Sequence, residues 1–212
     1  MVLRNVLISL IAAVCAQVWA AEVALVMSVQ GKVLKQEGVA PAPLEAYARL
    51  NSGDRLSLEK DARLRVAYFE NGRHETWAGP GELEMTARGG EPSGLSAPTV
   101  QSLPLAVARQ LARTPLAEGD GGRKVATRTR SVAAPDALAR LEATYRELRG
   151  KAGADDMEPE AYLLSALFEL RELDRVEKLL AELKQDRPGN PEAALLVALY
   201  RKAVRNARDA RK

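Results

Sequence analysis

This sequence of 212 residues contains one cysteine, one histidine and few aromatic residues, which make up 4% of the chain. Cys15 lies in the first 20 residues, so a chain cut after them has no disulfide, no thiol nucleophile and no thiolate metal ligand. His74 has no second histidine with which to share a metal ion. The scarcity of aromatic residues and a formal charge of only +3 argue against base stacking and phosphate binding. We therefore predict no metal site, no cofactor and no nucleic-acid partner.

Catalytic motifs are equally scarce. The sequence has no G-x-S-x-G motif, and the glycine pairs at Gly89-Gly90 and Gly121-Gly122 lack the Lys-Ser/Thr that completes a phosphate-binding loop. Glu70, His74 and Glu75 lie around one expected hairpin, where we expect a solvated charge pattern across two strands. Asp155-Asp156 fits a helix N-terminus, because the helix dipole favours anions there. We predict no catalytic residues and no enzymatic activity.

The first 20 residues have the features of an export signal. Arg4 precedes an almost wholly apolar run from Val6 to Val14, and the small residues Val18 and Ala20 suit cleavage after about Ala20. The run is shorter than the ~20 apolar residues that span a bilayer, which disfavours the alternative of an uncleaved anchor. Lipidation of Cys15 is disfavoured because Val14 stands where a lipoprotein signal has a small residue. We predict a periplasmic protein that meets the membrane only through the signal peptide of its precursor.

Residues 22–88 show the pattern of a small β domain. Apolar residues alternate at Val23, Leu25 and Met27, and again at Leu64, Val66 and Tyr68. Asn71-Gly72 lies between two such runs and predicts a two-residue type I′ hairpin, because both positions of that turn need positive φ.

A family resemblance rests on four segments of this region: Ser28-Val-Gln-Gly-Lys-Val33, Leu50-Asn-Ser-Gly-Asp-Arg-Leu56, Ala62-Arg-Leu-Arg-Val66 and Glu70-Asn-Gly-Arg73. Over about residues 23–86 the chain resembles the FecR-type periplasmic domain. The resemblance implies a small all-β domain of short paired strands that senses or binds outside the cytoplasm. Family members of the iron-citrate signalling type carry an anti-sigma region and a membrane helix before this domain. Here about 20 residues precede it, so the resemblance does not imply a transmembrane transducer.

Residues 89–134 are rich in Gly, Pro, Ser and Thr and are predicted to form a linker. Within it we expect a short helix over Leu103–Arg113, placed between two prolines. An extra strand is expected around residues 123–130, where basic residues alternate with Val, Ala and Thr. Its basic side chains suit a solvated edge better than an anionic polymer.

Residues 135–212 are predicted to be helical. The first helix runs from Pro135 to about Arg149, and three more begin near Pro159, Asp174 and Pro191. We expect the chain to fray from about Arg205 to its end. In the first helix, a spacing of three and four residues gives one apolar stripe, formed by Leu138, Leu141, Tyr145 and Leu148.

The second and third helices resemble a degenerate tetratricopeptide unit that closes at Pro188, and the fourth would open the next unit. Leu164, Val176 and Leu183 stand where the family has small residues, and Arg171 replaces its turn glycine. The resemblance implies a concave groove for a partner, lined by the second helix at Ala161, Tyr162, Ser165, Phe168 and Glu169. The alternative is that the first helix packs on Tyr162 and Phe168.

The predicted fold is thus a small all-β, FecR-like domain followed by an all-α, tetratricopeptide-like region. The predicted function is that of a non-catalytic periplasmic binding or assembly module. Its β domain would contact an envelope component such as peptidoglycan, and its helices would recruit an envelope protein. The alternatives are a ligand-sensing accessory of an envelope signalling system and a glycan-directed enzyme that uses Glu75 and Glu82.

Overall fold

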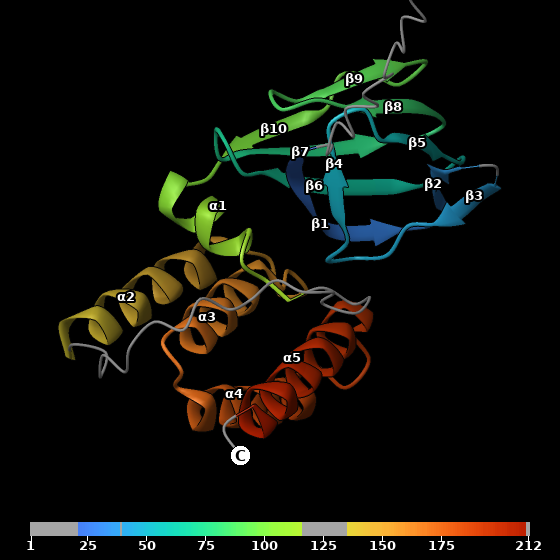
Figure 1. Cartoon of the computed structure of the whole chain (residues 1–212). Coiled ribbons are helices and arrows are strands. Elements are labelled where there is room, and N and C mark those ends of the chain that lie inside the picture. The colour runs from blue at the N-terminus through green and yellow to red at the C-terminus, as the bar shows by residue number, and fades with distance from the viewer. Residues whose placement is uncertain (1–20, 39, 116–134, 211–212) are drawn as a thin grey trace, which may run out of the picture.

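A computed structural model describes residues 21–38, 40–115 and 135–210. In these residues a β part precedes a helical part, as the sequence predicts (Figure 1). The strands are β1 (Glu22–Gln30), β2 (Val33–Glu37), β3 (Ala40–Pro43), β4 (Arg49–Asn51), β5 (Arg55–Leu58), β6 (Arg63–Tyr68), β7 (Arg73–Ala78), β8 (Gly81–Met85), β9 (Gly90–Ser93) and β10 (Thr99–Ser102). The helices are α1 (Leu105–Leu111), α2 (Pro135–Lys151), α3 (Glu158–Glu169), α4 (Leu173–Asp186) and α5 (Pro191–Asp209).

The strands form two antiparallel sheets of five strands each. Sheet A has the order β10-β7-β6-β1-β4, and sheet B has the order β3-β2-β5-β8-β9. The two sheets share one hydrophobic core, to which sheet A contributes Leu64, Val66 and Tyr68, and sheet B contributes Leu56 and Leu83. The alternation in β6 is therefore confirmed: every second side chain faces the other sheet, as in a sandwich.

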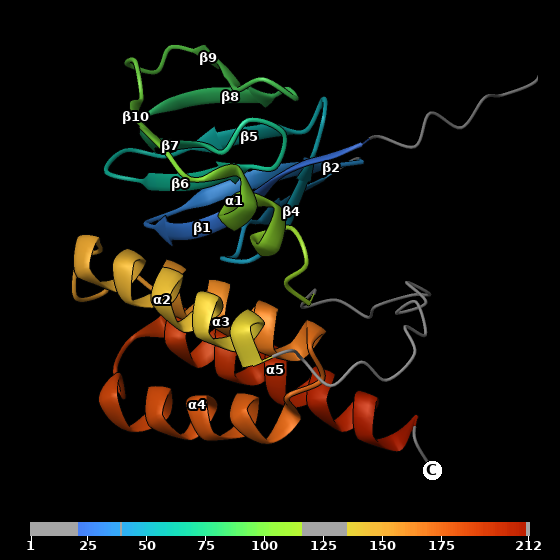
Figure 2. The same ribbon diagram turned by 90° about the vertical axis from the view of Figure 1, so that its left-hand side faces the viewer.

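The helices cover the other face of sheet A. Figure 2 shows the strands above the helices, with α4 farthest from the strands. The two hydrophobic cores place sheet A between sheet B and the helices. A second core joins sheet A to these helices and includes Leu25, Met27 and Ala67. The prediction that Val23, Leu25 and Met27 share one face is wrong, because Val23 packs in the sandwich core. The pairing register of β1 with β4 shifts between Glu22 and Ala24. Side chains after this shift therefore lie on the opposite face from the one that strict alternation from Val23 would give them.

The β6–β7 hairpin is present, but its turn differs from the predicted one. Gly72 has φ +67°, whereas Asn71 is not among the residues with positive φ, so the turn is not type I′. Ala67 pairs with His74, and the turn is closed by a hydrogen bond from the Gly72 N–H to the Tyr68 carbonyl (3.1 Å). The Asn71 side chain instead accepts a hydrogen bond from the Arg73 N–H (2.9 Å), an interaction that stabilises the longer turn.

The region predicted as a linker is partly ordered structure. Strands β9 and β10 lie in it and extend sheets B and A, respectively. The short helix expected over Leu103–Arg113 is confirmed as α1. The strand expected around residues 123–130 lies outside the described residues.

The four predicted long helices are confirmed as α2 to α5. Asn190 caps α5, since its side chain accepts a hydrogen bond from the Ala193 N–H (2.9 Å). The end of α5 is helical to Asp209 and does not fray from Arg205, because Arg208 bridges Asp174 and Glu177 of α4 at 2.8 Å each. No helix among the described residues combines the length and the apolar character needed to cross a membrane. The predicted signal peptide lies outside the described residues.

Candidate partner groove and buried polar interface

The five residues predicted to line a partner groove lie along α3. Ala161, Tyr162 and Ser165 are buried, Phe168 is half-buried and Glu169 is exposed. They do not form one open surface, because different parts of the chain contact different members of the set.

Helix α1 contacts the face of α3 that carries Ser165 and Glu169. The Ser165 hydroxyl donates to the Gln110 carbonyl (2.8 Å), and the Gln110 side chain donates to the Ser165 oxygen (3.0 Å). Arg113, just beyond α1, forms an ion pair with Glu169. The chain itself thus occupies part of the face that the sequence assigned to a partner.

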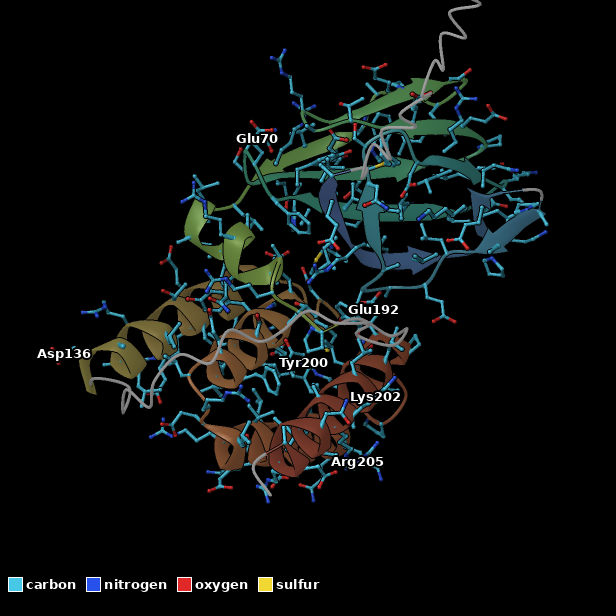
Figure 3. The ribbon with its side chains drawn as sticks, viewed as in Figure 1. Glu70, Asp136, Glu192, Tyr200, Lys202 and Arg205 are labelled. Atoms are coloured by element: carbon cyan, nitrogen blue, oxygen red, sulfur yellow. The ribbon has the colours of Figure 1, made fainter. Side chains whose placement is uncertain are left out.

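The two aromatic residues of the set have different neighbours. The ring of Phe168 meets that of Tyr200 in α5 edge to face, with centroids 6.0 Å apart and an interplanar angle of 76°. Figure 3 shows Tyr200 on the inner side of α5. Tyr162 instead lies beside Thr144 of α2. Burial raises the pKa of the Tyr162 hydroxyl, and its hydrogen bond with Thr144 opposes that shift. The alternative prediction is that the first helix packs on both Tyr162 and Phe168. The contact with Tyr162 has support, and the contact with Phe168 does not.

A groove remains between α1, α2 and α3. Its volume is about 280 Å³, and Tyr162 and Glu169 are the members of the predicted set that line it. Apolar side chains and polar or charged ones share its wall. The lining residues are Gln110, Ala137, Arg140, Leu141, Thr144, Tyr162, Ala166, Glu169 and Leu170.

On its other side, α2 borders a second groove, of about 210 Å³, shared with α3 and α4. The apolar stripe of α2 is confirmed: its four residues, Leu138, Leu141, Tyr145 and Leu148, are half-buried against the helical core. Tyr145 and Arg149 hold α2 to α3 through Glu160, at 3.1 Å and 3.0 Å. Helix α2 is thus held to α3 along its apolar stripe, and a groove lies on each side of this contact.

A partly buried ion pair joins sheet A to the helices. The Arg65 guanidinium of β6 donates two hydrogen bonds to the Asp156 carboxylate, at 2.7 Å and 2.5 Å. Asp156 also accepts a hydrogen bond from the Glu158 N–H (3.0 Å), so it stands at the N-terminus of α3, as the sequence predicts. Burial raises the pKa of Asp156, but the hydrogen bonds and charge of Arg65 outweigh burial and hold that pKa below its ordinary value.

A second polar contact lies beside this ion pair. His74 Nδ1 of β7 is 3.3 Å from Glu158 Oε2, and both side chains are buried. Burial lowers the pKa of His74 to about 4, and the charge of Arg65 acts in the same direction. Burial and the charge of Asp156 raise the pKa of Glu158 to about 7. At neutral pH the imidazole is therefore neutral, and its Nε2 has no hydrogen-bond partner.

Glu192 adds a third acidic group to this interface. It lies in the first turn of α5, on the side toward the sandwich (Figure 3). Burial raises its pKa to about 7; the charge of Arg65 opposes this shift, and those of Asp156 and Asp155 add to it. Three carboxyl groups therefore lie around the single guanidinium of Arg65.

The carboxylate of Glu75 is also buried, on the opposite face of β7. It accepts hydrogen bonds from Arg73 Nε (2.5 Å), Trp77 Nε1 (3.0 Å), the Gly90 N–H (3.0 Å) and the Tyr68 hydroxyl (3.1 Å). Because Gly90 begins β9 of sheet B, Glu75 ties the two sheets together. The expectation of a solvated Glu-His-Glu pattern is wrong, since only Glu70, at the turn, is exposed.

Among the described residues, no group of three or more His, Cys, Asp or Glu side chains is placed to hold a metal ion. Comparisons with protein-family models, with curated proteins and with solved structures find no match.

The sequence did not indicate the partners of Arg65 and His74. In the chain, 91 residues separate Arg65 from Asp156. One signal was available: the run Val23 to Met27 is apolar at every position, which is typical of a strand buried on both faces. A strand buried on both faces requires a second layer of structure packed on sheet A. A charged residue on the covered face of the sheet then needs a polar or oppositely charged partner within that layer.

Proposed function

We propose that this chain is a non-catalytic binding module exported to the periplasm. Its helical part would hold a protein partner, and its β part would contact an envelope component. The proposal combines the export features of residues 1–20 with the groove between α1, α2 and α3.

The groove is the observation that carries the proposal. Leu141 and Leu170 offer apolar contacts, while Arg140, Gln110 and Glu169 offer charges and hydrogen bonds. A site of this composition suits a short peptide segment that places one apolar side chain in the groove and bonds to the polar residues around it.

We further propose that α3 to α5 are a degenerate tetratricopeptide-like array. Its support is the order of contacts: α3 packs on α4, α4 packs on α5, and a short turn at Pro188 joins the last two. In this array, α1 fills part of the concave side, so the partner is expected at the neighbouring groove along α2.

For the β part we propose a FecR-like module that meets an envelope polymer such as peptidoglycan. Apart from the sequence segments that resemble this family, the support is the outer face of sheet B, which no described element covers. Cross-strand pairing places polar side chains there in rows, including Arg55 with Glu84 (3.1 Å) and Ser57 with Glu82.

A ligand-sensing accessory of a signalling system remains a second candidate, based on the family resemblance alone. The glycan-directed enzyme has less support. Four hydrogen-bond donors surround the Glu75 carboxylate, three at Oε2 and one at Oε1, and they occupy the lone pairs that a general base would need.

Two double variants of α2 test the groove. Ala137→Arg with Arg140→Glu fills the groove and reverses the charge beside it. Ala143→Arg with Arg146→Glu makes the same changes on the exposed opposite side of the helix. Purified chains are incubated with envelope extract, crosslinked, and the captured proteins are identified by mass spectrometry.

We expect the first variant to lose a protein that the wild type and the second variant both retain, with all three chains melting alike. Retention of every captured protein by the groove variant would contradict the proposal. Hydrolysis of peptidoglycan by the purified chain would contradict the non-catalytic assignment.

A further inference from the structure

Strand β10 is an edge of sheet A. Within residues 21–38, 40–115 and 135–210 it pairs with β7 on one side only, and all four of its residues are exposed. The hydrogen bond from the Leu103 N–H to the Gly72 carbonyl (2.8 Å) fixes which residues point inward. By antiparallel alternation, Thr99 and Gln101 direct their backbone groups to β7, whereas Val100 and Ser102 direct theirs away from the sheet. Two N–H groups and two carbonyls therefore form a row that has no partner in the described part of the chain.

The other sheet edges are protected. Strand β3 carries Pro41 and Pro43, and β9 carries Pro92, and each proline removes a donor. Strand β4 has three residues, and its Arg49 donates to the Ala112 and Thr114 carbonyls beyond α1. Strand β10 contains no proline and no charge, the two devices that most often prevent edge pairing.

Among the described residues, the exposed large hydrophobic side chains are Val100 in β10, 43% exposed, and Leu105 at the start of α1, 39% exposed. Val100 is paired with Glu75, so its side chain lies on the face of sheet A that is turned away from the helices. Exposed apolar side chains beside an unpaired edge mark a surface that association would cover.

The edge is self-complementary. We infer that two copies of this chain associate through β10, antiparallel, about a twofold axis at Gln101. In this register Val100 lies opposite Ser102 of the other copy and each pair exchanges two hydrogen bonds, so four bonds use every outward group of both strands. Because β10 is uncharged, the two copies meet without like-charge repulsion.

The sequence also limits this pairing. Pro98 and Pro104 each stand three residues from Gln101, and both have the outward parity of Val100 and Ser102. Neither has an N–H to donate, so the pairing ends after four bonds and yields a closed pair of copies. The contact is small beside the roughly 1,200 Å² of stable interfaces, so we expect association at high micromolar concentrations.

Charge substitutions in the proposed register test this inference. Val100→Lys with Ser102→Lys sets two pairs of like charges opposite each other, whereas Val100→Lys with Ser102→Glu sets two pairs of opposite charges in the same places. All these positions are exposed in the monomer, so both variants should fold like the wild type. Ala40→Lys, on edge strand β3, adds a charge away from the proposed contact.

Sedimentation velocity over a concentration series measures the association. We expect the wild type, Ala40→Lys and the Lys/Glu variant to dimerise, and the Lys/Lys variant to associate at least about tenfold more weakly. Val100→Pro removes one outward N–H and no bond to β7, and should also weaken the dimer. A wild type that is monomeric throughout the series overturns the inference, as does equal association of the Lys/Lys and Lys/Glu variants.

Discussion

At the scale of single residues, the contact between Arg65 and Asp156 is a polar link between the sandwich and the helices. Their side chains are only 22% and 16% exposed, so each charge depends on the other for its stabilisation. The loss of one partner leaves the other charge partly buried and without this ion pair, which is more damaging than the loss of both.

Asp156→Ala should therefore lower the free energy of unfolding by about 3 kcal/mol. Adding Arg65→Met to that variant should restore part of the loss, because the stranded charge is replaced by an apolar side chain of similar length. Urea denaturation of the two single variants and the double variant gives the coupling energy between the two residues.

The matched control is the exposed pair of Arg55 and Glu84 on sheet B, where the side chains are 71% and 45% exposed. The same substitutions there should change the unfolding free energy by no more than about 0.5 kcal/mol. Equal losses at the two pairs would show that the Arg65 contact has no special role.

The acidic groups at this interface also predict how stability depends on pH. The pKa values of Glu158 and Glu192 are raised to about 7 in the folded chain, so the folded state holds protons that the unfolded state has lost. Their contribution is complete below about pH 4.5 and is lost as the pH rises through about 7. His74, with its pKa lowered to about 4, opposes them between about pH 4 and 6.5.

We therefore expect the free energy of unfolding to fall between pH 6.5 and 8, where the carboxyl groups act without opposition from His74. Glu158→Gln should reduce that slope, and Glu82→Gln, at an exposed position, should leave it unchanged. Denaturant titrations at several pH values measure the slope; a stability that rises over this interval would refute the assignment.

At the scale of elements, the β6–β7 turn depends on Gly72. Its φ is +67°, and a Cβ at this position would lie 2.5 Å from the Leu103 carbonyl oxygen, which follows β10. The turn, the start of α1 and the edge of sheet A therefore meet at a residue that has no room for a side chain.

Gly72→Ala should destabilise the chain by about 3 kcal/mol, because backbone strain and a steric clash act together. Gly53→Ala is the control: its φ is +88°, but nothing lies within 4 Å of the added Cβ, so strain alone should destabilise by about 1 kcal/mol. Thermal or urea unfolding of both variants gives the difference. Equal losses would show that the contact with Leu103 is unimportant.

Local signals in the sequence predicted most elements. Prolines at the first turns predicted α3 and α5, and the alternation in β6 gave the correct inner face. Strands β9 and β10 were missed because Pro92 and polar residues give them no strand pattern, and they form by pairing with β8 and β7. Tertiary pairing, and not local preference, decides such segments.

At the scale of the whole molecule, the prediction of the site was limited by contacts between distant segments. The sequence placed Tyr162 and Glu169 on one helix face, and both line the groove. It could not show that Gln110 would bond to Ser165, 55 residues away, and cover the rest of that face. Periodicity identifies an apolar face but does not identify which element covers it.

The shared second core predicts that the two parts unfold together. Leu25, Met27 and Ala67 of sheet A pack in one cluster with Leu164 and Tyr200 of the helices. Calorimetry of the whole chain should show a single transition. A fragment of residues 21–115 should bind a hydrophobic dye such as ANS and melt at a lower temperature, because one face of sheet A is then exposed to water. Two separate transitions, or a fragment as stable as the intact chain, would contradict this.

Strand β1 has a consequence for how the chain reaches its final state. Among the described elements it is synthesised first, yet its backbone partner β6 follows only after about 40 residues, and α3, which shares the core on one of its faces, begins at Glu158. In that interval five consecutive apolar residues are without their final neighbours. A holding chaperone that acts before folding is complete would therefore find its binding segment in β1, the first of the described strands.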